Sequence, residues 1–262
     1  MNSGANPNAA DTNGITALHY AMRKGFAGFD GVEYTPSLPP PPNMPELVKA
    51  LLTHGADPNA RIAKDYPEFS RTAVNFHTSL IGMTPYLLAA AAADPGLMQL
   101  LADHGADPSL MAKGNVTALM LAAGAARIQD RTGRDATDAL EAVQVAVQLG
   151  ADVNVVDGRG RTALHAAAAM GADDIVQFLA SKGANVNAKD KGGNTPWSTA
   201  AALIPVLNAQ GGLRFHKSTA DLLLKLGAKE ITLKDFPAAA SAYGNPPAEA
   251  DKQKAPPPAA PQ

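Results

Sequence analysis

Histidine is the residue type in this chain best suited to catalysis or metal binding, and the spacing of the histidines indicates neither role. Six occur, at His19, His54, His77, His104, His165 and His216. Two follow the triplet Thr-Ala-Leu, and two directly precede a glycine that ends an apolar helical run, where a cation interacts favourably with the helix dipole. The remaining pair, His77 and His216, lies far apart in a chain without cysteine, which is not the ligand spacing of a metal site. We predict no metal and no cofactor.

The carboxylates and glycines that could serve other chemistry also lie in repeated positions. Asp57, Asp107 and Asp152 each follow Gly-Ala, which predicts turn residues rather than catalytic acids. Gly158-Arg159-Gly160 is a single Gly-x-Gly with no buried strand before it, so a phosphate-binding loop is not indicated. The sequence contains neither Gly-x-Ser-x-Gly nor His-Glu-x-x-His. We therefore predict a protein that is not an enzyme.

These positions recur because the chain repeats one pair of phrases. The closing phrase Gly-Ala-Asp or Gly-Ala-Asn begins at Gly4, Gly55, Gly105, Gly150 and Gly183, with a decayed copy at Gly227. The opening phrase Thr-(Ala/Pro)-Leu-His, or a variant of it, begins at Thr16, Thr84, Thr117, Thr162 and Thr195. From Gly150 to Gly183 the period is 33 residues, whereas the other steps span 44 to 51 residues and therefore contain insertions.

The two phrases and the 33-residue period resemble the ankyrin repeat. The resemblance extends from residue 4 to about residue 230, and arrays with similar insertions between helices look like those of environmental bacterial ankyrin proteins. It implies stacked helix pairs with hairpin-like connections, and a structural hydrogen bond from His19 and His165 to neighbouring backbone. It also implies partner binding through the hairpin tips and the concave face of the first helices, without catalysis.

The residues of each phrase predict the same local structure on physical grounds. Ile175-Val176-x-x-Leu179 places its apolar side chains on one face of a helix, and the glycine after such a run is typical of a left-handed helix cap. The segment from Asn187 to Gly193 is rich in turn-forming residues, and the Thr195 hydroxyl can accept a hydrogen bond from the first turn of the next helix. One such helix pair cannot bury its apolar face alone, so neighbouring pairs must stack.

We therefore predict an all-α solenoid of about five units over residues 4–234, followed by a disordered Pro/Ala-rich tail over residues 237–262. Alignment of the units on their opening Thr and closing Gly predicts insertions near residues 26–43, 61–77, 127–138 and 205–215. The insertion near 61–77 would lengthen a hairpin. The other three would lie between the two helices of a unit.

Composition excludes several other classes of protein. Hydrophobic residues make up 46% of the chain but aromatic residues only 5%, which favours close packing of Ala-rich helices. The net charge of -2 argues against nucleic-acid binding, and no apolar run approaches the roughly 18 residues of a membrane helix. The lack of cysteine leaves the redox compartment open. The chain starts without a charged and apolar leader, so its localisation stays open with cytoplasmic as the default. We also predict a monomer.

The start of the chain raises an alternative. Ile15, Leu18 and Met22 form an apolar face, and nothing earlier in the sequence covers them. Because the terminal units of such arrays need a polar outer face, we expect earlier repeats, and an export signal in an exported parent protein, to lie upstream. The chain would then be a C-terminal regulatory or accessory domain of a larger enzyme or exported protein. A frayed but tolerated first unit is the other interpretation.

The insertions contain most of the aromatic side chains, at Phe26, Phe29, Tyr34, Tyr66, Phe69, Phe76 and Phe215. In one interpretation they pack back onto the solenoid, since long unanchored loops are uncommon. In the other they form a partner pocket, for which the best candidates are Tyr66, Phe69, Arg71, Phe76 and His77 of the lengthened hairpin. We expect a split between the two, with Phe76 as an anchor and Tyr66 and Phe69 more exposed. The proline run over 36–42 similarly fits either a stiff spacer or a PxxP ligand.

The predicted function is a protein-interaction scaffold with an unidentified protein partner. Its contacts would come from the hairpin tips, the concave face of the first helices and the inserted loops. The candidate contact residues are Arg23, Lys24, Tyr66, Phe69, Arg71, Arg159, Met170 and Lys191. The concave face is otherwise small and apolar from Ala91 to Leu203, so either the chain's own loops or a partner should cover it.

Overall fold

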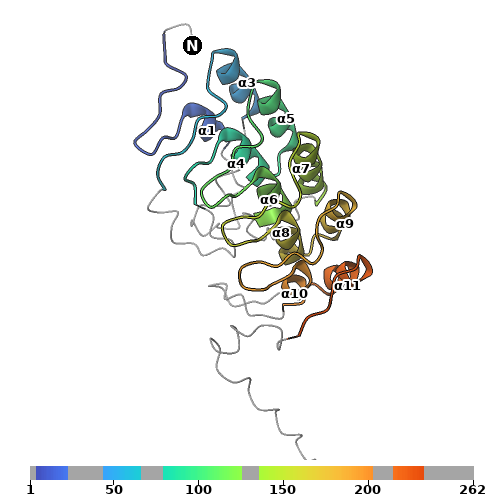
Figure 1. The fold of residues 1–262 in the computed structure, drawn as a ribbon. Helices are drawn as coiled ribbons and strands as arrows, with labels where there is room; N and C mark the ends of the chain where they lie inside the picture. Colours follow the sequence, from blue (N-terminus) through green and yellow to red (C-terminus); the bar gives the residue numbers. More distant parts are fainter. Residues whose placement is uncertain (1–3, 23–43, 66–78, 126–135, 203–214, 233–262) are drawn as a thin grey trace, which may run out of the picture.

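The computed structural model describes residues 4–22, 44–65, 79–125, 136–202 and 215–232. These residues form five helix pairs that stack in chain order, with the hairpin-like connections along one edge (Figure 1). Within this part of the chain there is no strand, and the extended pairing is limited to isolated bridges between Ala10 and Thr16 and between Ala112 and Val116. The protein is an all-α solenoid, as its repeated phrases predict.

Each pair consists of a first helix on the inner side of the stack and a second helix on the outer side. The first helices are α1 (Ala17–Ala21), α4 (Pro85–Ala91), α6 (Ala118–Met120) with the π-helical segment η2 (Leu121–Ala125), α8 (Ala163–Met170) and α10 (Pro196–Ala200). The second helices are α3 (Pro45–Thr53), α5 (Pro95–Asp103), α7 (Ala136–Gln148), α9 (Asp173–Ser181) and α11 (Lys217–Lys225). First helices of successive pairs pack on one another.

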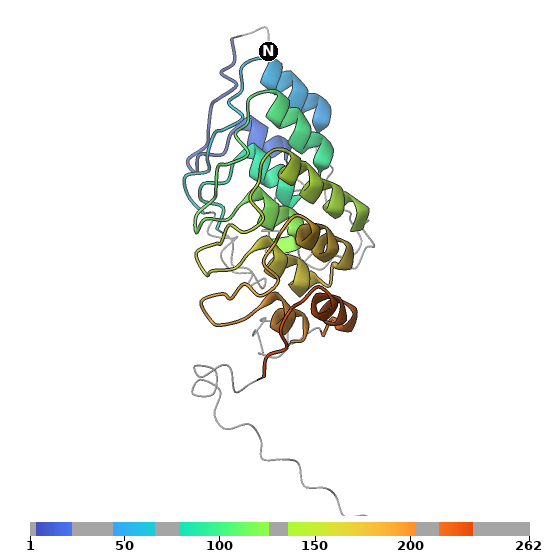
Figure 2. The same ribbon diagram turned by 45° about the vertical axis from the view of Figure 1, so that its right-hand side comes forward.

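We number five units by their closing glycines. The first unit is residues 4–55, the second 56–105, the third 106–150, the fourth 151–183 and the fifth 184–227. Each unit begins with a hairpin and continues into its helix pair (Figure 2). Three segments that join the two helices of a unit lie mostly outside the described residues: those between α1 and α3, between η2 and α7, and between α10 and α11. Most of the predicted hairpin insertion and all of the predicted tail also lie outside them.

The first helices begin at the threonine of the opening phrase. The Thr84 hydroxyl accepts a hydrogen bond from Leu87 N (3.3 Å), and the Thr117 hydroxyl accepts one from Met120 N (3.2 Å). The extended backbone of these N-cap threonines leaves the side-chain oxygen free to satisfy an N–H group that the helix itself cannot pair. Thr195 does the same for Ser198 N, so the predicted caps are confirmed.

The second helices end at the predicted glycines. Gly55, Gly105, Gly150, Gly183 and Gly227 all have left-handed φ values, between 84° and 94°. At Gly183 the N–H donates to Ala180 O, and the next N–H, of Ala184, donates to Leu179 O, both at 3.0 Å. This pair of bonds satisfies carbonyl groups of the last turn and requires a positive φ at the glycine. The prediction of left-handed caps is confirmed.

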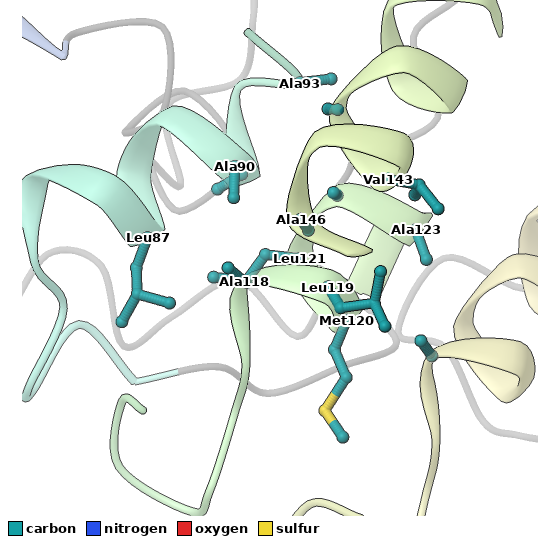
Figure 3. Packing of buried hydrophobic residues seen from close by; sticks show 14 of the residues in the cluster. Leu87, Ala90, Ala93, Ala118, Leu119, Met120, Leu121, Ala123, Val143 and Ala146 are labelled. Atoms are coloured by element: carbon teal, nitrogen blue, oxygen red, sulfur yellow. The ribbon is translucent and has the colours of Figure 1, made fainter. Parts of the chain in front are cut away.

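The core runs continuously through all five units and consists mainly of alanine and leucine. Figure 3 shows its centre, where the third unit's first helix faces α4 on one side and α7 on the other; the labelled side chains are Leu87, Ala90, Ala93, Ala118, Leu119, Met120, Leu121, Ala123, Val143 and Ala146. Small side chains allow the helices to approach closely, which explains why so few aromatic residues suffice.

The third unit departs from the regular geometry. Its first helix has three α-helical residues before it becomes π-helical, and Gly124 within η2 has φ 107° and ψ 8°. A β-carbon at Gly124 would lie 2.6 Å from Cγ of Met170, so this glycine allows α8 of the fourth unit to pack closely. Asn115 in the same unit's hairpin also has a positive φ, of 59°.

The prediction that the apolar face of the first helix lacks a covering neighbour is wrong. Ile15, Leu18 and Met22 are almost fully buried and belong to the continuous core. Their unit packs through α1 against both α3 and α4, and these contacts provide the apolar surroundings. The helical spacing of these apolar residues shows that they share a face, but it does not show which neighbouring helix covers that face.

Candidate protein-interaction surface

The base of each hairpin is fixed by an aspartate or asparagine that binds its own backbone. Asp57 Oδ1 accepts a hydrogen bond from Asn59 N (2.8 Å), and Asp152 Oδ1 accepts one from Asn154 N (2.8 Å). Asn6, Asp107 and Asn185 make the same turn. The predicted assignment of the three aspartates as turn residues is confirmed, and their carboxylates are exposed.

Neighbouring hairpins are joined by what we call an asparagine bridge, a side chain that binds the carbonyl of its own unit's closing glycine and the N–H group two residues after that glycine. Asn154 Nδ2 donates to Gly183 O (3.0 Å), and Asn154 Oδ1 accepts from Asn185 N (2.8 Å). Asn8, Asn59 and Asn187 make the equivalent pairs of bonds. Each bridge fixes the spacing between two successive hairpins.

The third unit lacks this bridge among the described residues. Ser109 occupies the position, and its hydroxyl donates instead to Asp107 Oδ1 of its own turn (2.6 Å). This short bond is the main cause that lowers the pKa of Asp107 below its usual value. Serine is too short to reach the next hairpin, so the base of the third hairpin has no side-chain connection to the fourth.

The tips of the hairpins are closed by a second set of aspartates. Asp157 Oδ1 accepts from the N–H groups of Arg159 (2.8 Å) and Arg161 (2.9 Å), and its other oxygen pairs with the Arg161 guanidinium at 2.6 Å. Asp190 and Asp11 hold their tips through equivalent backbone bonds. Burial raises the pKa of Asp11, but the bonds from Ile15, Asn13 and Tyr20 outweigh it, and the net pKa is lowered.

Backbone hydrogen bonds connect one tip to the next. Lys113 N donates to Ile81 O (2.8 Å), and Lys191 N donates to Arg159 O (2.8 Å). Ala63 N donates to Asn13 O (2.7 Å), and the third and fourth tips are joined through Gly158 N and Gly114 O (2.6 Å). The tips therefore form one continuous edge of the molecule, visible on the left of Figure 2.

His19 and His165 are structural, as the resemblance implies. His19 Nδ1 accepts from Thr16 N (3.2 Å), and Nε2 contacts Met83 O of the second unit at 3.3 Å. His165 repeats this arrangement with Thr162 N (3.1 Å) and Asn194 O (3.1 Å). Burial lowers the pKa of His19 to about 4 and also lowers the pKa of His165, so both rings are neutral near pH 7 and donate through Nε2.

The concave face offers less accessible surface than the sequence indicates. Ala91, Ala92 and Gly124 are buried, and Ala169 and Met170 are half-buried. The side chain of Met170 lies against Gly124 of the preceding unit, which the close approach of Cγ to that glycine shows. Met170 therefore packs between the third and fourth units.

Arg159 and Lys191 are the predicted contact residues that the structure places together, exposed on adjacent hairpin tips. Met170 lies on the concave face, away from the tip edge. The others, Arg23, Lys24, Tyr66, Phe69 and Arg71, lie outside the described residues, as does Phe76. Among the inserted aromatic residues, Phe215 is described; it is 59% exposed, so it does not anchor its insertion to the solenoid.

Two other exposed tip cations, Lys64 and Lys113, are not among the predicted contact residues. Lys64 N donates to the carbonyl of Asn13 (3.2 Å), and Lys113 N donates to that of Ile81, so both belong to the same edge as Arg159 and Lys191. The sequence places both cations at tip positions, because Lys113 directly precedes the tip glycine Gly114 and Lys64 lies in the hairpin before Thr84. The insertion after Lys64 obscured that register.

The described residues contain no group of three or more His, Asp or Glu side chains placed to hold a metal ion. In the same part of the chain, none of the helices combines the length and the apolarity needed to span a lipid bilayer. The hairpin edge supplies hydrogen-bonding and charged side chains on a fixed backbone, and such side chains are typical of protein–protein interfaces.

Stacked helix pairs with connected hairpins define a repeat protein of the α-solenoid class. A family model of the ankyrin repeat matches residues 13–63, and a model of three ankyrin repeats matches residues 135–235. The chain belongs to the ankyrin-repeat family. Ankyrin repeats are in general protein–protein interaction modules and are typically non-catalytic. Neither match includes residues 64–134, which contain the irregular first helix of the third unit.

Proposed function

We propose that this protein is a monomeric, non-catalytic scaffold that binds a partner protein mainly along its hairpin tips. The observation that carries the proposal is the continuous tip edge, in which Arg159 and Lys191 are exposed while their backbone groups are hydrogen-bonded to each other. Because the backbone of this edge is already fixed, binding does not have to order it, which lowers the entropic cost. The concave face and the inserted loops would add contacts beside this edge.

The alternative is a regulatory or accessory domain of a larger enzyme or exported protein. The sequence favours this alternative only if the apolar face formed by Ile15, Leu18 and Met22 is uncovered, and these residues are buried. We therefore place the scaffold first. In the alternative, the same tip edge would bind another domain of the parent protein.

Site-specific photocrosslinking tests where the partner binds. A photoreactive residue at Arg159 samples the tip edge, and one at Gln177, exposed on α9, samples the outer face as a matched control. In an extract of the source organism, we expect a discrete protein crosslinked from position 159 and none from position 177. Crosslinking from the outer face alone would contradict a tip-mediated scaffold.

A further inference from the structure

One exposed cation from each of four successive hairpins takes part in the backbone hydrogen bonds that join the tips. These are Lys64, Lys113, Arg159 and Lys191, which we call the tip row. The ion pairs found among the described residues join Arg161 to Asp157 and Lys217 to Asp221. Within that part of the chain, the four tip cations therefore have no carboxylate partner of their own.

The acidic residues of the tips are occupied by their own hairpins. Asp157 is buried and paired with Arg161. Asp65 accepts from Ser79 Oγ (2.7 Å) and Leu80 N (2.7 Å), and Asp190 accepts from the backbone and side chain of Asn194. These carboxylates are buried or half-buried, whereas the cations of the tip row are exposed. Along the second to fifth hairpins the outermost charge of this edge is therefore positive, whereas the first hairpin exposes Asp11.

The backbone bonds between tips fix the spacing of these cations. Neighbouring units are separated by about one helix-packing distance, roughly 8–10 Å. An extended segment in the polyproline II conformation has three residues per turn and rises about 3.1 Å per residue, so side chains three residues apart point to the same side and are separated by roughly the same distance. A single extended chain with an acidic side chain at every third position therefore matches the tip row.

We propose that the tip row binds an extended acidic segment of the partner protein. This inference rests on the proposed scaffold function and specifies the chemistry of its partner. A wide polyanion such as duplex DNA fits less well, because the bases of the same hairpins expose Asp57, Asp107 and Asp152. An extended peptide can follow the tips without approaching those carboxylates, and the chain's net charge of -2 gives no general attraction to polyanions.

Synthetic peptides of twelve residues provide the probe. One has Glu at every third position with Ser and Gly between, a second has the same composition with its Glu residues adjacent, and a third replaces Glu by Gln. We expect the spaced peptide to bind most tightly by fluorescence anisotropy, to weaken as salt increases, and the Gln peptide not to bind. Equal binding of the spaced and clustered peptides would overturn a row-specific site.

Charge-reversal variants of the full chain locate the site. Lys113→Glu with Arg159→Glu should weaken binding of the spaced peptide by at least about tenfold, because two like charges then oppose it. Lys49→Glu with Lys225→Glu makes the same change in net charge on α3 and α11, and should have little effect. Equal loss in both variants, or tighter binding of a single-stranded oligonucleotide, would overturn the proposal. If the crosslinked partner is retained by the Lys113/Arg159 variant, the scaffold stands and its acidic recognition fails.

Discussion

The third and fourth units follow the same chain path but are held together differently. The fourth unit has a continuous first helix, the Asn154 bridge and the buried His165 that binds the next unit. The third unit has a π-helical segment with Gly124 at φ 107°, Ser109 in place of the bridging asparagine, and Met120 at the histidine position. Because the apolar packing is similar in both units, we expect the core to determine the stack and the hydrogen bonds to adjust its local stability.

Substitution of the third unit's internal glycine should have the largest effect. Gly124→Ala combines an unfavourable φ with a β-carbon 2.6 Å from Met170 Cγ, so we expect unfolding free energy to fall by about 3 kcal/mol. Gly183→Ala has a similar φ but no atom within 4 Å, and should cost about 1 kcal/mol. Urea denaturation measures both.

A double variant separates the two causes at Gly124. If close packing contributes, Gly124→Ala with Met170→Ala should be more stable than the sum of the two single losses predicts. Strict additivity would show that backbone conformation alone makes the third unit sensitive at this position.

The buried histidines should make the first and fourth units sensitive to acid. The unfolded chain binds a proton at His19 near pH 6.5, whereas the folded chain binds it only near pH 4. Stability from this group is therefore complete above about pH 6.5 and decreases as the pH falls, by about 2 kcal/mol between pH 7 and pH 5. His165 contributes in the same direction.

Leucine is the natural control, because Leu87 fills the histidine position in the second unit. His19→Leu should lower stability at pH 7, since Thr16 N and Met83 O lose their partner, but should flatten the decrease in stability between pH 7 and pH 5. Chemical denaturation at both pH values measures this slope. An unchanged slope in the His19→Leu/His165→Leu variant would show that these rings are not the acid-sensitive groups.

The regular features of the fold were predictable because they depend on local chemistry. Glycine after an apolar run, threonine before a helix and aspartate in a turn each satisfy nearby backbone groups, and the structure confirms them. The accessible part of the surface was harder to predict, because burial depends on packing between units. Met170 could be assigned to the concave face from its register, but its contact with Gly124 required the unusual backbone of η2.

Removal of an asparagine bridge should have a smaller effect than the preceding changes. Asn154→Ala deletes two hydrogen bonds at an exposed site, one to Gly183 O and one from Asn185 N of the fifth unit, and we expect a loss of about 1 to 2 kcal/mol. The equivalent change in the third unit, Ser109→Ala, removes only bonds within its own turn and should cost less than about 0.5 kcal/mol. Similar losses from both would mean that the bridges contribute little to the contact between units.

Installing the absent bridge is the most direct comparison of the two units. Asn59 and Asn154 show that asparagine keeps the bond to its own turn and adds two bonds at the base of the next hairpin. Ser109→Asn should therefore reach Gly150 O and Asp152 N and raise unfolding free energy by about 1 kcal/mol. Hydrogen exchange should slow at Asp152 and across 118–125, while 163–170 stays as in the wild type. A stability gain without slower exchange at Asp152 would place the effect in the turn itself, and no gain would show that the irregular first helix holds the third and fourth hairpins too far apart for the bridge to form.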